Sequence, residues 1–349
     1  MAGFASVIDQ QRPVRILTSF LREKTYPHAL LFTGIEGVGK GNAAEIFARA
    51  CNCKSAAKTD NGGSSEIPLN LPCDRCRSCR KIESGNHPDI IRIKPAGQFI
   101  RIDQIRALGD TLNLKPYEAK LRVVIIRHAH TMNPSASNAL LKMLEEPPAR
   151  TILILTALQT TDLLPTIVSR CQHIRFNPIS RSTLARFLNS EHGVAPERAE
   201  VLAAMANGSL TRAVKMAGSD WLRQRKWLIE ASGLDQPGML ASRQRPELLA
   251  FAEILARDRK DLPLRLEVLK FWLRDLLIFP HDPSRIINVD LKEHISGAAG
   301  QLPQSTLEEG YHAIQSAEKN LQSNANVRLT LEDMMFKLAG LYNTQIVSH

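Results

Sequence analysis

The stretch LRVVIIRHAHTMNPSASNALLKMLEEPP, residues 121–148, contains one expected strand and the helix that follows it. The run of Val and Ile at 123–126 is unbroken, which is typical of a strand buried on both faces of a parallel sheet. Asn133 and Pro134 suit the N-cap and the first position of a helix, and Pro147 ends that helix. The segment therefore predicts one strand-helix unit of an α/β fold.

Nitrogen bases follow this strand at the places where a P-loop ATPase carries acids. They are Arg127, His128 and His130. In open α/β sheets the ligand crevice lies at the carboxyl ends of the strands. In a P-loop ATPase this strand end carries a carboxylate that holds Mg²⁺, and commonly a second one that orients water. We therefore expect a strand end that does not support ATP hydrolysis.

The same alternation of apolar runs and helical periodicity covers the first half of the chain. The expected strands are 28–33, 87–93, 123–126, 151–157 and 172–176. Strands that alternate with helices predict a doubly wound parallel sheet over residues 1–178. The remaining sequence reads as helices only. It predicts a small helical lid at 179–218 and a larger helical domain at 219–349.

A phosphate-binding pattern follows the first expected strand. GIEGVGKG at residues 34–41 matches the P-loop pattern GxxxxGK[ST] except at its last position. The backbone N–H groups around Gly34, Gly37 and Gly39 can close around phosphate oxygens, and Lys40 can reach the β- and γ-phosphates. Position 41 should offer a hydroxyl to Mg²⁺, yet it is Gly. Two interpretations stay open: a loop that binds ATP or another anion, and a glycine turn without nucleotide.

Four of the six cysteines lie close together in the sequence, within residues 53–79. The two x₂ spacings that join Cys73, Cys76 and Cys79 let backbone turns direct neighbouring sulfurs at one ion, and four thiolates suit tetrahedral Zn²⁺. Cys53 is the natural fourth ligand because it lies at a helix end, with Cys51 as the alternative. We predict a structural zinc site in an insertion at about 51–80; reduced, unligated thiols are the other interpretation.

The composition limits the classes of function. The chain has 349 residues and a formal net charge of +10, which permits contact with nucleic acid but equally fits a solvated basic surface. The few aromatic residues are not interleaved with basic ones, which argues against a stacking groove for single strands. No apolar stretch is long enough to cross a bilayer, and the N-terminus has no signal-peptide core. We expect a soluble cytoplasmic protein without membrane contact.

Six segments together carry a resemblance to a known family. They are HALLFTG (28–34), the Cys-x₂-Cys-x₂-Cys insertion, HPD (87–89), NALLKMLEEPP (138–148), SRC (169–171) and NANVRLTLE (324–332). In combination they resemble the delta-prime family of bacterial DNA polymerase III clamp-loader subunits, part of the AAA+ superfamily. The resemblance implies a AAA+ P-loop domain, a helical lid and a C-terminal helical collar that joins neighbours in a ring. It also implies partners: gamma or tau motor subunits, the delta subunit and, through them, the sliding clamp and primed DNA.

The resemblance assigns its most specific role to Arg170. In the family the arginine of Ser-Arg-Cys reaches across the subunit boundary to the γ-phosphate of ATP bound by a motor subunit. Its guanidinium is a permanently charged fork that offsets charge on the transferred phosphoryl group. The other interpretation is an arginine that caps the preceding helix, and both can hold at once. The resemblance thus implies a member of the DNA polymerase III holoenzyme that has no ATPase activity of its own and completes a neighbour's active site.

Two further functions stay open. The chain could be an active ATPase in which His128 or His130 replaces a metal-binding carboxylate, although imidazole is a poor ligand for Mg²⁺. It could also be a DNA-binding zinc module, as the cysteines and the charge suggest. Against that function, no recognition helix adjoins the cysteine cluster in the sequence.

Overall fold

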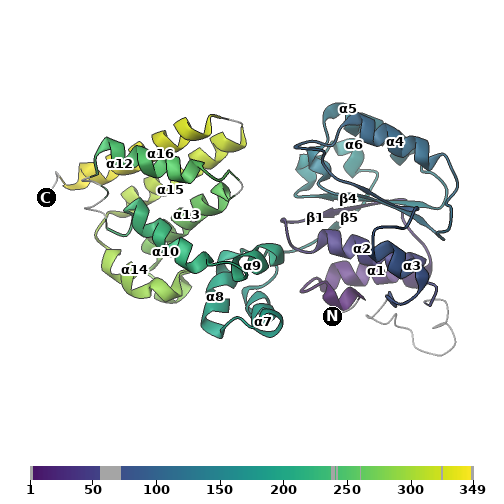
Figure 1. The fold of residues 1–349 in the computed structure, drawn as a ribbon, viewed down its shortest axis with the longest axis horizontal. Coiled ribbons are helices and arrows are strands. Elements are labelled where there is room, and N and C mark those ends of the chain that lie inside the picture. Colours follow the sequence, from purple (N-terminus) through teal and green to yellow (C-terminus); the bar gives the residue numbers. More distant parts are fainter. Residues whose placement is uncertain are drawn as a thin grey trace. The chain divides into compact units, whose positions relative to one another are not determined.

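The computed structural model describes residues 3–55, 72–236, 240, 243–259, 261–323 and 325–346, with only the backbone at 322 and 342–346. The chain divides into two compact units (Figure 1). Unit 1 extends to Phe187 and includes Ala206–Val214, and unit 2 consists of Leu188–Met205 and the described residues from Lys215 onward. The domain boundaries after 178 and 218 stay predictions. Residues 56–71 of the expected insertion lie outside the described part of the chain.

A five-stranded parallel sheet forms the centre of unit 1, with the strand order β2-β3-β4-β1-β5. The strands are β1 (Ala29–Thr33), β2 (Ile90–Ile93), β3 (Arg122–Ile126), β4 (Thr151–Ala157) and β5 (Gln172–Arg175). Every residue of β1, β3 and β4 is buried, because helices cover both faces and the strands are almost wholly apolar. The predicted doubly wound parallel sheet is confirmed.

Helices pack on the two faces of this sheet (Figure 1). On one face lie α1 (Gln11–Glu23), α2 (Lys40–Asn52) and α3 (Arg77–Glu83); on the other lie α4 (Ile102–Leu112), α5 (Pro134–Glu145) and α6 (Pro165–Val168). On the second face, Leu108, Leu140 and Ile167 from the helices belong to one buried core with Val124 and Leu153 from the strands. The core therefore fixes α5 and α6 to the same sheet.

The start of α5 follows the sequence pattern. Asn133 is its N-cap, and its Oδ1 accepts a hydrogen bond of 2.8 Å from the backbone N–H of Ala136. Pro134 takes the first helical position, where its missing N–H leaves no partner unsatisfied. The end of β3 and the start of α5 are thereby set by local residues.

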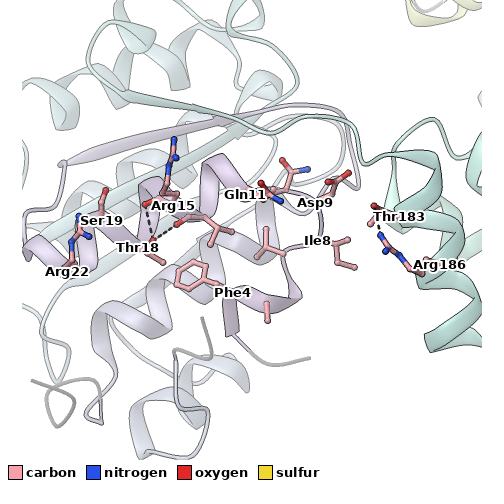
Figure 2. A pocket seen from close by; sticks show the side chains of 14 residues that line it. Phe4, Ile8, Asp9, Gln11, Arg15, Thr18, Ser19, Arg22, Thr183 and Arg186 are labelled. Atoms are coloured by element: carbon pink, nitrogen blue, oxygen red, sulfur yellow. Dashed lines mark hydrogen bonds between the residues drawn. The ribbon is translucent and has the colours of Figure 1, made fainter. Parts of the chain in front are cut away.

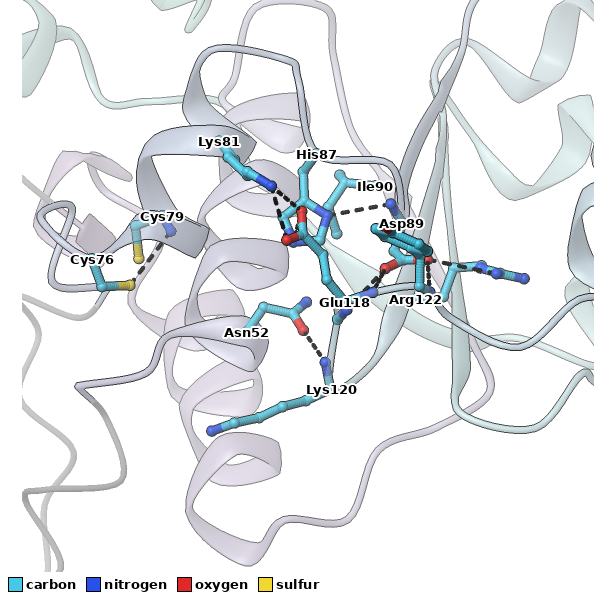
Figure 3. Close-up of polar contacts among 12 residues, drawn as sticks. Asn52, Cys76, Cys79, Lys81, His87, Asp89, Ile90, Glu118, Lys120 and Arg122 are labelled. Carbon is cyan, nitrogen blue, oxygen red and sulfur yellow. Dashed lines mark hydrogen bonds and ion pairs between the residues drawn. The ribbon is translucent and has the colours of Figure 1, made fainter.

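Three buried polar side chains hold the loop at 113–121, between α4 and β3 (Figure 3). The Asp89 carboxylate accepts backbone N–H bonds of 2.8 Å from each of residues 117–119. Arg122 donates to the carbonyls of residues 111, 114 and 115 at 2.7–3.0 Å, and Asn52 Oδ1 accepts from the N–H groups of 120 and 121. Burial raises the pKa of Asp89, but these N–H donors and Arg122 outweigh it and lower that pKa.

Unit 2 is helical in its described residues. Its helices are α8 (Pro196–Met205), α10 (Trp221–Ser232), α12 (Arg245–Ala256), α13 (Leu262–Ile278), α14 (Lys292–Ala298), α15 (Gln304–Gln322) and α16 (Val327–Ile346). Two further helices, α7 (Arg181–His192) and α9 (Leu210–Ala217), begin in unit 1 and end in unit 2. Trp272 is buried and donates its Nε1–H to Leu234 O at 2.9 Å. Within the described residues, no helix has the length and apolarity needed to span a bilayer.

Candidate functional site

The loop between β1 and α2 needs glycine for backbone reasons. Gly34, Gly37 and Gly39 have φ values of 143°, 79° and 102°, in the region that L side chains rarely adopt. A Cβ on Gly34 would lie 2.4 Å from Phe176 O, and one on Gly37 would lie 2.1 Å from Ser209 Oγ. These glycines therefore satisfy the fold as well as the P-loop pattern, and do not by themselves indicate a nucleotide.

Lys40 is turned onto its own loop. Its Nζ donates to the carbonyl oxygens of Gly34 and Ile35, the latter at 2.8 Å. The residue is only 9% exposed, and burial lowers the pKa of its ammonium to about 8 although the Glu36 carboxylate opposes the shift. The one strong cation of the P-loop is thus held by backbone carbonyls of the same loop.

A guanidinium lies beside position 41, where the P-loop pattern has the hydroxyl that binds Mg²⁺. A Cβ built on Gly41 would lie 3.5 Å from Arg127 Cζ, in ordinary contact. Arg127 Nη2 is 3.2 Å from Glu45 Oε1 on α2, and Glu45 also receives two bonds of 2.8 Å from Arg92. The Arg127 side chain is thus directed toward position 41 by an ion pair with α2. The sequence predicted the missing acid at 127, but it gave no signal for this pairing.

The two histidines complete the end of β3. The ring centroids of His128 and His130 are 5.8 Å apart. Burial lowers the pKa of His130, and the neighbouring His128 lowers it further. The backbone N–H of His128 donates to Thr156 Oγ1 on β4 at 3.1 Å. A neutral His130 is consequently the form expected at pH 7.

These groups line a pocket of about 440 Å³ together with the start of α9. Among the described residues of its lining, Glu36 is the one carboxylate. The backbone N–H groups of Leu210 and Thr211 donate to Gly37 O at 3.0 and 3.4 Å. The sequence did not predict this contact, because the two segments are far apart in the chain and no local pattern links them.

Arg170 lies on a different edge of the sheet. It precedes β5, whose first residue Gln172 pairs with Leu30, so it lies toward the amino-terminal ends of the strands; the P-loop follows their carboxyl ends. Arg170 Nη1 donates to Thr166 O at 3.0 Å, and Nη2 is 2.9 Å from Glu145 Oε1. The side chain is 36% exposed. The helix-capping contact considered from the sequence is therefore present, and the role toward a neighbouring subunit stays a prediction.

Four of the predicted zinc ligands come together in space. The Sγ atoms of Cys53, Cys73, Cys76 and Cys79 all lie within 4.8 Å of one another. Tetrahedral Zn²⁺ with Zn–S bonds of about 2.3 Å separates its sulfurs by about 3.8 Å, so small adjustments suffice to hold the ion. Cys51 lies outside this group: it is buried on α2, and burial raises the pKa of its thiol.

The thiols of the cluster differ in how readily they ionise, because burial and the neighbouring Cys76 raise the pKa of Cys79. Burial opposes ionisation of Cys73, but hydrogen bonds from Ser55 and from the backbone of Arg75 and Cys76 outweigh it and lower its pKa to about 6. Arg49 on α2 pairs with Asp74 at 2.7 Å and so ties the cysteine segment to that helix. The donor set and its support fit a closed structural site without an open position for a substrate.

A larger pocket of about 800 Å³ lies along α1 (Figure 2). Arg15 and Arg22 line it from the helix, and Thr183 and Arg186 line it from α7. Its Asp9 carboxylate accepts the backbone N–H of Ser180 at 2.8 Å and serves the local fold. We assign this pocket no chemistry, because the described residues that line it include no cysteine or histidine and have Asp9 as their one carboxylate.

Comparisons with known proteins give consistent matches. One family model, described as DNA polymerase III, delta subunit, matches residues 9–180, and a second, described as DNA polymerase III, delta subunit, C terminal, matches residues 220–340. DNA polymerase III subunit delta' of Bacillus subtilis (strain 168) is 31% identical over 333 residues, which cover 94% of this chain and 96% of that protein. DNA polymerase III subunit tau of the same organism is 28% identical over 356 residues, covering 96% of this chain and 61% of that protein.

Among solved structures, a DNA polymerase III gamma subunit-related protein from Thermotoga maritima superimposes with a TM-score of 0.40 and 19% identity. The superposition covers 96% of this chain and 100% of that one. The sequence similarity to the delta' relative extends over nearly the whole of both chains.

Proposed function

Because the chain belongs to the delta-prime family of DNA polymerase III clamp-loader subunits, we propose that it is the subunit that hydrolyses no ATP itself and supplies Arg170 in trans. The recipient is the ATP site of a neighbouring gamma or tau motor subunit. In this role the chain helps to load the sliding clamp onto primed DNA, together with the delta subunit. Its AAA+ sheet and C-terminal helical collar are those of the family.

The position of Arg127 is the observation that supports the proposed absence of ATP hydrolysis. A hydrolysing site needs Mg²⁺ beside position 41, held by a hydroxyl there and by a carboxylate on β3. Here position 41 has no side chain, and a guanidinium carbon lies 3.5 Å from where its Cβ would be. The guanidinium carries charge of the same sign as Mg²⁺ and takes the place of the carboxylate that would bind the ion. Arg127 therefore disfavours the metal that hydrolysis requires.

The proposed role at a neighbour's ATP site depends on Arg170. Of its five N–H groups, one on Nη1 donates to Thr166 O, and Nη2 lies 2.9 Å from Glu145 Oε1 in an ion pair. Three donors stay available to a phosphate presented by another subunit. The side chain is partly exposed and lies on the sheet edge opposite the P-loop, so it is accessible to a neighbour without involving the chain's own pocket.

We also propose that Cys53, Cys73, Cys76 and Cys79 bind one structural Zn²⁺. The ion would join the end of α2 to the start of α3, with Cys76 as the N-cap of α3. A four-thiolate site stabilises the fold and takes no part in ATP chemistry. Both interpretations of the P-loop, with and without bound ATP, are compatible with this proposal.

The test is clamp- and DNA-stimulated ATP hydrolysis by a reconstituted loader that contains either the natural chain or Arg170→Ala. Arg12→Ala, which removes an exposed arginine from the first turn of α1, is the matched control. In GTPases an arginine finger accelerates hydrolysis by roughly 10³–10⁵, so we expect near-complete loss at the one motor site beside this chain, with assembly unchanged. Unchanged turnover would contradict the role in trans.

The isolated chain provides the second test. We expect no ATP hydrolysis above background. A measurable rate that disappears in Lys40→Ala would instead favour an ATPase with an atypical metal site.

A further inference from the structure

The ion pair between Arg170 and Glu145 has no part in the roles described so far. Glu145 is the last residue of α5, and its Oε1 lies 2.9 Å from Arg170 Nη2. We propose that Glu145 is a positioning residue, which fixes the direction of the Arg170 guanidinium and so acts on a neighbour's ATP site through that arginine. This inference rests on the proposed role of Arg170 in trans.

Both points that hold the guanidinium belong to one rigid core. Thr166 is on α6 and Glu145 is on α5, and these helices pack through Leu140, Leu144 and Ile167 in the same buried cluster. An arginine side chain loses considerable rotamer freedom when it docks. A side chain that is already held at two points loses less, so the contact orders Arg170 before the neighbour arrives.

The stability of α5 does not account for an acid at this position. The carboxyl end of a helix carries partial negative charge, which disfavours Glu145. The side chains of Glu145 and Arg170 are 51% and 36% exposed, and ion pairs between exposed groups contribute little to folding. The carboxylate of Glu145 is therefore better explained by its orientation of Arg170 than by any stabilisation of α5.

The pair leaves the arginine able to bind phosphate. Thr166 O accepts one N–H of Nη1, and Glu145 Oε1 lies 2.9 Å from Nη2 in an ion pair. Nε–H and the second N–H on each terminal nitrogen stay available. The guanidinium can therefore keep its carboxylate while it contacts a phosphate oxygen.

The adjacent acid offers a matched control. Glu146 follows Glu145 directly, is also exposed, and has no ion pair within the described part of the chain. Glu146→Ala removes the same charge from nearly the same place without removing the contact to Arg170. It therefore separates the effect of local charge from the effect of position.

The experiment uses a reconstituted loader whose motor copies have their own Ser-Arg-Cys arginines changed to Ala, so that Arg170 is the one finger left. We expect Glu145→Ala to lower kcat about tenfold and to leave KM for ATP within about twofold. Glu145→Gln, whose amide oxygen can take the same position beside Nη2, should keep more than about half of the rate. Glu146→Ala should match the natural chain, and thermal midpoints should be the same for all variants.

Arg170→Ala in the same loader separates the two proposals. If Arg170→Ala leaves kcat unchanged, the proposed function is wrong and the positioning role is lost with it. If Arg170→Ala removes the activity while Glu145→Ala keeps it or raises it, the proposed function stands and the positioning role is wrong. In the Arg170→Ala background, Glu145→Ala should cause no further loss; an additional loss would show that Glu145 acts independently of Arg170.

Discussion

Arg127 shows how a single side chain can redefine a P-loop pocket. The sequence alone predicts that the strand end lacks an acid. It does not predict where the guanidinium goes, because that direction is set by Glu45 on a helix far away in the sequence. The structure shows in addition that the Arg127 guanidinium lies next to position 41.

This arrangement makes a prediction about nucleotide binding. The double variant Gly41→Ser with Arg127→Asp restores a hydroxyl and a carboxylate, the hard oxygen ligands that Mg²⁺ prefers. We expect it to bind ATP at least about tenfold more tightly with Mg²⁺ than with a chelator, as measured by titration calorimetry. The natural chain and Gly41→Ser alone should show no such dependence on the metal. A gain in the single variant would mean that Arg127 does not exclude Mg²⁺.

At the scale of elements, the loop at 113–121 is organised by side chains that lie outside it. Asp89 precedes β2, Arg122 begins β3 and Asn52 ends α2, and Asp89 and Asn52 accept the backbone N–H groups of residues 117–121. The sequence predicted the strand that follows this loop but not the contacts that hold the loop, because each partner is distant in the chain.

Replacing Asp89 should therefore weaken unit 1. In Asp89→Asn the amide has one acceptor oxygen and turns an NH₂ group toward N–H donors, so we expect the free energy of unfolding to fall by about 2–4 kcal/mol. Urea denaturation at pH 7 measures this change. Asp110→Asn, an exposed acid on α4, is the control and should have little effect.

The pH dependence of the same variant follows from the lowered pKa of Asp89. The folded carboxyl binds its proton at lower pH than the unfolded one, whose value is near 3.8. The stabilisation is therefore complete above the unfolded pKa and is lost as the pH falls through the folded pKa. The difference between the natural chain and Asp89→Asn should shrink as the pH is lowered through this range; a constant difference would contradict the ionised role of Asp89.

At the scale of the whole molecule, the chain consists of two compact units, each with its own stabilising side-chain cluster. Unit 1 contains the four clustered cysteines. Unit 2 contains the buried Arg225, which pairs with Asp290 and donates to Asn288 at 2.7 Å. Each unit can thus be perturbed separately.

We expect two calorimetric transitions. Removal of zinc by a chelator should lower the midpoint of one transition, because a structural zinc site contributes directly to folding. Arg225→Met should lower only the other, since it leaves Asp290 and Asn288 without their buried partner. The purified chain should contain about one zinc, and Cys73→Ser should lose it while Cys171→Ser keeps it. A single transition that responds to both changes would contradict independent units.

The elements that the sequence predicted best are those with strong local signals. Uninterrupted apolar runs located β1, β3 and β4, and the Asn-Pro pair located the start of α5. Short helices without such signals, α3 and α14, were not predicted. The strand order also depends on long-range pairing, which local patterns do not contain.

The residues of the candidate site also fall into those that local sequence patterns predicted and those that only the tertiary fold revealed. The P-loop and the cysteine spacing are local patterns and were recognised, yet the choice between Cys51 and Cys53 depended on which side of α2 faces the cluster. The partners of Arg127 and Arg170 are carboxylates on other elements, brought near by the tertiary fold. Sequence reasoning could name the arginines but not what holds them.

The opposite placement of Arg170 and the P-loop gives the subunit a polarity. The two lie about 20 Å apart along the parallel strands β1 and β5, at opposite ends of the same sheet. In a closed head-to-tail ring of equivalent members, each one gives an arginine at one end and receives one at the other, so ATP sites equal members in number. In the role proposed above, this chain would give Arg170 to a neighbour and, with Arg127 in its own pocket, would remove one site from that count. On that proposal, the chain would mark where a directional series of ATP sites ends, and the order of events around the ring would have a fixed boundary.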